Sequence, residues 1–89
     1  MRKEEKRLWH EGCIGVPTPG THGKETVKYW VKAYDTGSEY GINGGKISKL
    51  RMEINGETVA DYDREWAKKP DEDDETVMIA YYILLNDYN

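Results

Sequence analysis

Alternating apolar and polar positions in the middle of the chain predict β-strands. Residues 26–34 are rich in β-branched and aromatic residues and alternate with a period of two, and apolar and polar residues alternate again over 46–54. The dipeptide Asn55-Gly56 separates the second run from a third, residues 57–63. Both turn residues tolerate the positive φ angles of a type I′ turn, so the second and third runs predict a β-hairpin.

The segment before these runs is harder to interpret. Residues 8–16 are a candidate first strand with Trp9 as its anchor, although two glycines interrupt the pattern. Prolines and glycines between residues 17 and 24 predict a loop. A glycine-rich connection, residues 35–45, follows the next predicted strand.

The C-terminal segment has the pattern of a helix. Its apolar side chains recur at helical spacing: Val77, Tyr81, Leu84 and Tyr88, widened by Met78, Tyr82 and Leu85. Lys69-Pro70 ends the strand pattern, and Asp71 is the expected N-cap of a helix whose first residues are acidic. The sequence therefore predicts an α+β fold: an antiparallel meander of three to four strands with one C-terminal helix packed on one face, in two layers.

One helix covers one face of such a sheet, and the other face meets water or a partner. If Val27, Val31 and Leu50 face the helix, the period of two places basic and aromatic residues on the uncovered face: Lys28, Trp30, Lys32, Tyr34, Lys49 and Arg51. A register shift of one residue would exchange the two faces.

The length of 89 residues fits one domain, which we place at residues 8–89 behind a mobile arm of residues 1–7. Cys13 is the only cysteine, so no internal disulfide forms, and the composition suits the reducing cytoplasm. The charged N-terminus argues against a signal peptide. The longest apolar run, residues 79–85, is far shorter than the ~20 residues that span a bilayer, so we expect no membrane partner.

Charge is distributed unevenly along the chain. Residues 1–55 hold ten Lys/Arg and seven Asp/Glu, a balance of +3, whereas residues 56–89 hold three and ten, a balance of −7. Such a division can steer a partner of either sign, or serve solubility alone.

Candidates for metal binding and catalysis are few. His10, Cys13 and His22 are suitable zinc ligands, but their spacing matches no standard pair. A Cys13–His10 nucleophile pair lacks an obvious group to orient the histidine. The sequence therefore predicts no enzyme, no catalytic residue, no metal and no cofactor.

Carboxylates repeat with a period of two at Asp61, Asp63 and Glu65, which is a pattern that can hold Mg²⁺. Solvation and the neighbouring Arg64 and Lys68 satisfy these carboxylates equally well. The acidic run 71–75 is in the first place a helix-capping cluster. Its alternative interpretation is a DNA-mimicking patch, made by Asp61, Asp63, Glu65, Asp71, Asp73 and Asp74.

The glycines of residues 41–45 do not form a phosphate-binding loop, because the order G-x-x-x-x-G-K-[ST] is absent and a strand follows. A turn with positive φ angles explains them. The alternative is a binding loop that offers Glu39, Tyr40, Ile42 and Asn43 to a partner.

The segments Ser38-Glu-Tyr-Gly-Ile-Asn-Gly-Gly-Lys-Ile-Ser-Lys-Leu50, Val59-Ala-Asp-Tyr-Asp-Arg64 and Leu84-Leu-Asn-Asp-Tyr-Asn89 carry a resemblance. The chain resembles a family of very small, uncharacterised proteins of Firmicutes genomes, phages and mobile elements. It departs from that pattern at Glu65, where a glycine is expected, and in its N-terminal extension. The resemblance implies no activity and no catalytic residues. Small proteins of this origin often bind and inhibit a host factor.

Two functions from different classes follow. The first is a noncatalytic binding protein that engages and inhibits a host protein, such as an anti-CRISPR or other anti-defence factor. The second is a small nucleic-acid-binding accessory protein that uses the basic and aromatic face, although the net charge of −4 opposes it. A homodimer formed through that face, with Trp30 and Tyr34 as anchors, is a further alternative.

Overall fold

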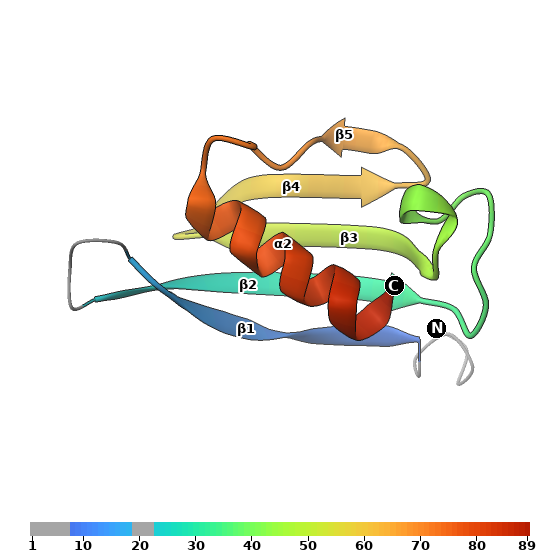
Figure 1. Ribbon diagram of the computed structural model, residues 1–89, viewed down its shortest axis with the longest axis horizontal. Coiled ribbons are helices and arrows are strands. Elements are labelled where there is room, and N and C mark those ends of the chain that lie inside the picture. Colours follow the sequence, from blue (N-terminus) through green and yellow to red (C-terminus); the bar gives the residue numbers. More distant parts are fainter. Residues whose placement is uncertain (1–7, 19–22) are drawn as a thin grey trace.

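The computed structural model describes residues 8–18 and 23–89, so the predicted arm over 1–7 lies outside the described residues. Five antiparallel strands form one sheet in chain order: β1 (Trp9–Pro17), β2 (Lys24–Ala33), β3 (Ile47–Ile54), β4 (Glu57–Asp63) and β5 (Trp66–Lys68). A short 3-10 turn, η1 (Ile42–Gly44), precedes β3, and the α-helix α2 (Glu75–Tyr88) ends the order of elements. The helix crosses one face of the sheet obliquely (Figure 1). The predicted α+β meander with one C-terminal helix is thereby confirmed.

The β3–β4 hairpin has the predicted turn. Asn55 and Gly56 adopt φ angles of 52° and 79°, which a type I′ turn requires. Beyond the turn, a bulge shifts the register, so that Glu53 pairs with Thr58 whereas Met52 pairs with Ala60.

The core lies between α2 and the sheet. Val27 and Val31 of β2 and Leu50 and Met52 of β3 are almost completely buried and face Val77 and Leu84 of the helix. The predicted assignment of the two sheet faces is therefore correct. Within the described ranges, no helix combines the length and the apolar character needed to span a membrane.

Two details of the helix differ from the prediction. Thr76 and Ala80 belong to its buried side, whereas Tyr82 is 59% exposed, so the apolar stripe does not widen toward Tyr82. The N-cap is Asp74, not Asp71: the Asp74 carboxylate accepts a hydrogen bond from the backbone N–H of Val77 at 3.2 Å. Asp71 instead accepts one from the backbone N–H of Asp73 at 2.9 Å, in the turn before the helix.

Strand β5 is a fifth strand that the sequence pattern did not predict. It has three residues, and Trp66 provides its attachment to the core. The Trp66 ring lies edge-on to Tyr62 of β4, with centroids 4.9 Å apart, and edge-on to Tyr81 of α2, with centroids 5.8 Å apart. Packing between aromatic rings therefore holds this strand against the helix layer.

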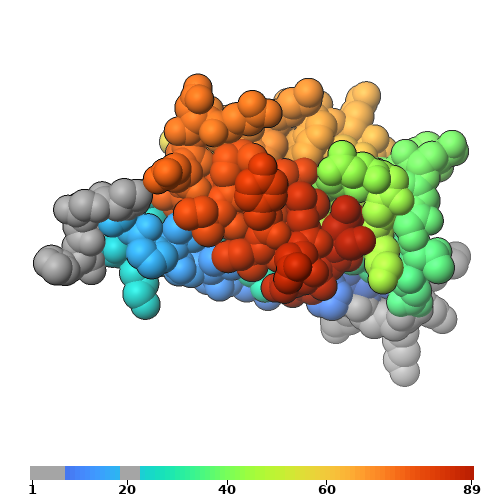
Figure 2. All heavy atoms as spheres, viewed as in Figure 1, coloured from blue at the N-terminus to red at the C-terminus, as the bar shows by residue number. Residues whose placement is uncertain are grey.

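Two hydrogen-bonding side chains fix the connection between β2 and β3, residues 34–46. The Asn89 side-chain amide accepts from the N–H of Ile47 at 3.0 Å and donates to the carbonyl of Ile42 at 3.1 Å. The Tyr62 hydroxyl donates to the carbonyl of Tyr40 at 2.8 Å. In Figure 2 the green atoms of this connection lie directly beside the C-terminal end of the helix. The connection is thus bound to both layers of the fold.

Candidate functional site

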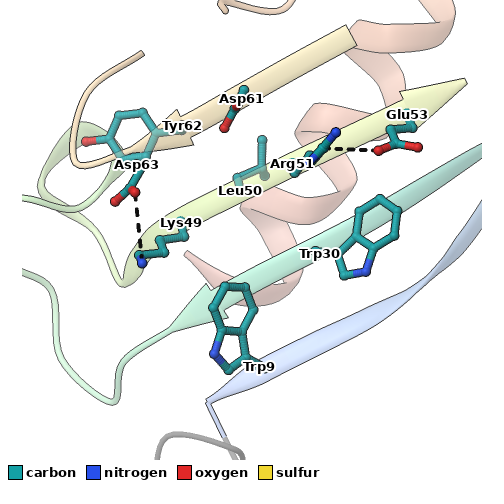
Figure 3. A pocket seen from close by; sticks show the side chains of 9 residues that line it. All are labelled: Trp9, Trp30, Lys49, Leu50, Arg51, Glu53, Asp61, Tyr62 and Asp63. Atoms are coloured by element: carbon teal, nitrogen blue, oxygen red, sulfur yellow. Dashed lines mark ion pairs between the residues drawn. The ribbon is translucent and has the colours of Figure 1, made fainter. Parts of the chain in front are cut away.

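The sheet face away from α2, here called the open face, carries charged and aromatic side chains from four strands. Because Val31 pairs with Leu50 on the helix side, the neighbouring pair of Trp30 and Arg51 lies on the open face. The same register argument assigns the other members of this face: Trp9, Glu11 and Cys13 of β1, Lys28 and Lys32 of β2, Lys49 and Glu53 of β3, and Asp61 and Asp63 of β4. Figure 3 shows the central part of this face, with the helix behind the sheet.

Cations and carboxylates alternate across the open face. Lys28 pairs with Glu53 across strands, and Arg51 pairs with Asp61. The Arg51 Nε atom lies 3.0 Å from a carboxylate oxygen of Glu53, and the Lys49 Nζ atom lies 3.9 Å from one of Asp63. Opposite charges that face each other on neighbouring strands stabilise the sheet, whereas Lys32 lies opposite another cation, Lys49.

Two tryptophans give the open face its apolar surface. Trp9 and Trp30 are half-buried and line a shallow depression of about 320 Å³ in the middle of the face. This central depression is bordered by Trp9, Trp30, Lys49, Leu50, Arg51, Glu53, Asp61, Tyr62 and Asp63. In Figure 3 the two indole rings stand on β1 and β2, and the charged side chains lie along β3 and β4. The surface thus joins large aromatic area to paired charges.

Lys32 occupies a position between aromatic rings at one end of the open face. Lys32 is only 8% exposed, and its Nζ atom lies 5.9 Å from the ring centroid of Trp9 and 5.4 Å from that of Tyr34. Cation–π attraction to both rings helps to hold the ammonium group there. The ammonium group of Lys32 therefore lies near the rings of both Trp9 and Tyr34.

A second hollow, here called the loop-end depression, lies where β2, β3 and the β4–β5 turn meet the connection. Its volume is about 640 Å³, and its lining is polar. The lining residues are Lys32, Tyr34, Thr36, Gly37, Ser38, Tyr40, Ser48, Lys49 and Arg64.

The predicted partner-binding residues fall into three places. The open face itself holds Lys28, Trp30, Lys32, Lys49 and Arg51. Tyr34 and Tyr40, 44% and 53% exposed, stand at its loop end. Glu39 and Asn43 are exposed in the connection, and Asn43 has the positive φ angle of 53° that was expected of this turn.

The acidic residues considered as a DNA mimic are divided between the layers. Asp61 and Asp63 lie on the open face among cations. Glu65 is exposed in the turn after β4. Asp71, Asp73 and Asp74 belong to the segment that leads into α2.

The candidate zinc and nucleophile residues do not converge in the structure. The His10 ring stacks on Tyr88 of the helix, with centroids 4.6 Å apart, whereas Cys13 is exposed on the open face. His22 lies outside the described residues. Across residues 8–18 and 23–89, no three His, Cys, Asp or Glu side chains are grouped as metal ligands would be.

Two residues of these surfaces were missed as site residues. Trp9 was expected only to anchor a strand, yet its pairing with Lys32 places it on the open face. The signal was available, because the period of two in residues 8–16 sets Trp9 and Cys13 on one side. Arg64 was considered only as a partner of neighbouring carboxylates. Its place in the loop-end depression follows from a turn conformation with a φ angle of 66°, which the sequence does not indicate at an arginine.

The chain belongs to a domain family of unknown function, DUF7678, whose model matches residues 8–89. The expectation of an uncharacterised family is confirmed by this match. No curated protein and no solved structure matches the chain. The family description assigns no activity.

Proposed function

We propose that this chain is a noncatalytic binding protein that engages a partner protein through the open face. The observation that carries the proposal is the pair of half-buried indoles, Trp9 and Trp30, on a sheet face that no element of the described chain covers. Tryptophan, tyrosine and arginine are the residues that most often dominate binding energy at protein interfaces. Trp30 and Arg51 are cross-strand neighbours at the centre of this face.

The charge pattern favours a protein over a nucleic acid as the partner. Arg51 and Lys49 each lie within 4 Å of a carboxylate, so their charges are partly neutralised before any ligand arrives. Alternating charges on this face match a partner surface whose charges alternate in the opposite sense. Such complementarity aligns the two proteins and disfavours partners with other charge patterns. The resemblance to proteins of phages and mobile elements extends the proposal to a host protein in the cytoplasm as the partner and to inhibition as the result.

Capture from a host lysate treated with nuclease tests the proposal. The tagged chain is compared with Trp9→Ala and Trp30→Ala, and with Tyr82→Ala as a matched control that removes an exposed aromatic ring from the helix. We expect one protein to be retained by the parent chain and by Tyr82→Ala, and to be lost in both tryptophan variants. An unchanged circular dichroism spectrum shows that each variant is folded. Equal retention by all four proteins would contradict the role of the open face.

Nucleic-acid binding is the second candidate, and one observation favours it. Lys28, Lys32, Lys49 and Arg51 share the open face with Trp30, and bases can stack on aromatic rings while cations contact phosphates. Binding of a single-stranded oligonucleotide that weakens steeply with added salt supports this function. Retention in the capture experiment that disappears with nuclease would also favour it over a protein partner. Self-association in sedimentation, lost in Trp30→Ala, identifies a second copy of the chain as the occupant.

A further inference from the structure

The two edges of the sheet, β1 and β5 (Figure 1), are protected to different degrees. β5 has three residues, its pairing with β4 contains a register shift, and its last residue, Lys68, is followed by Lys69 and Pro70. Short length, irregular pairing, lysine and proline keep an edge strand from pairing with another chain. β1 has nine residues, pairs with β2 without a register shift, contains no lysine and has a proline only at its last position. Among the residues that the structure describes, β2 is the only strand beside it.

Hydrogen bonds beyond both ends of β1 show which of its backbone groups point away from β2. The N–H of Ala33 donates to the carbonyl of Leu8 at 3.0 Å. At the other end, the N–H of Thr18 donates to the carbonyl of Gly23 at 3.1 Å, and both pairs continue the β1–β2 register. Because bonded and non-bonded pairs alternate in an antiparallel ladder, the even-numbered residues of β1 bond to β2. The odd-numbered residues direct their backbone groups to the outer edge: Trp9, Glu11, Cys13, Gly15 and Pro17, of which only the proline lacks an N–H.

We propose that β1 pairs antiparallel with β1 of a second copy of the chain, with Gly12 facing Gly12 of that copy at a two-fold axis. This register pairs Trp9 with Gly15 and Glu11 with Cys13 of the second copy. The outward N–H and C=O groups from Trp9 to Gly15 then all have partners. Of the two neighbouring registers, one sets Glu11 directly opposite Glu11 of the other copy, where like charges repel. The other sets Trp9 opposite Pro17, which cannot donate.

Side chains on the open face fit this register. A glycine opposite Trp9 leaves room for the indole ring to lie across the junction between the two copies. Glu11 faces Cys13 of the second copy, whose neighbour on β2 is Lys28. A hollow of about 270 Å³ borders Glu11, Cys13 and Lys28, so the Glu11 carboxylate of one copy can approach the Lys28 ammonium group of the other above the small Cys13 side chain. Opposite charges therefore meet on both sides of the two-fold axis.

The paired edges form one continuous sheet. Because the two-fold axis is perpendicular to the sheet, both copies of α2 lie on the same side, and the two open faces lie side by side on the other. The inference does not depend on the proposed function, since pairing through β1 leaves the open faces uncovered. A chain that fails to pair through β1 can still bind a protein partner, and the reverse also holds.

The test is amide hydrogen exchange of the full chain at micromolar and at millimolar concentration, with the mass measured by sedimentation equilibrium. We expect a dimer whose share rises with concentration, and in the dimer exchange at Glu11 and Cys13 should be slower than in the monomer by about tenfold or more. The amides of Gly12 and Ile14 bond to β2 and should be protected in both forms. A monomer at millimolar concentration would overturn the proposal. So would a dimer in which Glu11 and Cys13 exchange as fast as in the monomer, or a monomer in which both are already protected.

Cys13→Pro blocks the edge without removing a bond of the sheet, because the N–H of Cys13 points away from β2. The affinity for the second copy should fall by about tenfold or more, while the circular dichroism spectrum stays unchanged. Cys13→Ser keeps the N–H and is the matched control. It should dimerise like the parent chain, which also excludes an intermolecular disulfide as the cause. Equal dimerisation of the two variants would contradict the proposal. Dimerisation that Cys13→Pro keeps and Trp30→Ala loses would assign the contact to the open face instead.

An exchange of charges tests the register. Glu11→Lys should lower the affinity for the second copy by about fivefold, because it brings cations together on both sides of the two-fold axis. The double variant Glu11→Lys, Lys28→Glu restores opposite charges and should recover most of the affinity. Glu57→Lys makes the same change in net charge at an exposed position of β4 and should dimerise like the parent chain. A double variant as weak as Glu11→Lys, or an equal loss in Glu57→Lys, would overturn the proposed pairing.

Discussion

The hydroxyl oxygens of Tyr29 and Tyr88 lie 3.4 Å apart, where the last turn of α2 meets β2. Their ring centroids are 6.3 Å apart, and the Tyr88 ring also stacks on His10 of β1. Tyr88 therefore attaches the end of the helix to the two strands at the β1 edge of the sheet. This contact involves a titratable group, so it makes the stability of the fold depend on pH.

The hydrogen bond to Tyr29, with a further contribution from burial, raises the pKa of Tyr88 from 10.0 to about 12. Between these values the unfolded chain releases a proton that the folded chain retains. The free energy of unfolding should therefore fall as the pH rises from about 10 to about 12, and this group should contribute no pH dependence below that range. Burial raises the pKa of Tyr81 too, which acts in the same direction.

Tyr29→Phe should lower the pKa of Tyr88, because it removes the partner hydroxyl. The measurement is the tyrosinate absorbance during an alkaline titration. In each background, the curve of the variant that also carries Tyr88→Phe is subtracted, which leaves the titration of Tyr88. Tyr34→Phe removes an exposed hydroxyl at the loop end and serves as the control. An unchanged Tyr88 titration in Tyr29→Phe would show that the hydrogen bond is not the main cause of the shift.

Asn89→Ala should destabilise the fold by about 1–3 kcal/mol, because it leaves the N–H of Ile47 and the carbonyl of Ile42 without their side-chain partner. Urea denaturation measures the loss, and hydrogen exchange at the Ile47 amide should accelerate. Asn86→Ala, at an exposed position of the same helix, is the control and should change stability little. The same loss in both variants would contradict a specific role for Asn89.

Gly56→Ala should cost about 1 kcal/mol of stability, because the residue has a φ angle of 79° and a Cβ atom is strained there. Nothing lies within 4 Å of the position that this Cβ atom would take, so the cost is conformational rather than steric. Asn55→Gly tests the neighbouring turn position and should be close to neutral. Thermal unfolding distinguishes the two, and an equally stable Gly56→Ala would refute the type I′ assignment.

The strand pattern of residues 26–63 could be predicted because local signals and tertiary packing agree there. The alternation in β2 and β3 correctly divides buried Val31 and Leu50 from Trp30 and Arg51 on the open face. The Asn55-Gly56 turn then indicates that the next strand, β4, pairs with β3 in an antiparallel hairpin. Sequence alone therefore identified the central strands of the open face.

Other features depend on contacts between distant residues, which no local pattern records. Strand β5 has only three residues, and it is held by the packing of Trp66 against Tyr62 and Tyr81. The loop-end depression is lined by residues from β2, β3, the connection between them and the β4–β5 turn, which are far apart in the sequence. Neither relationship follows from periodicity.

Three aspartates lie just before α2, and only one of them caps the helix. Asp71, Asp73 and Asp74 carry the same group, but only the Asp74 side chain accepts a hydrogen bond from a backbone N–H of the first helical turn, that of Val77. Asp74→Ala should therefore lower the free energy of unfolding by about 1 kcal/mol. Asp73→Ala removes the same charge one residue earlier and leaves the Val77 bond intact, so it should cost less. Urea denaturation of both variants at low and high salt separates capping from the helix dipole, since only the dipole term is screened. Equal losses that vanish together in high salt would mean that charge near the helix end, and not the cap of Asp74, stabilises the start of α2.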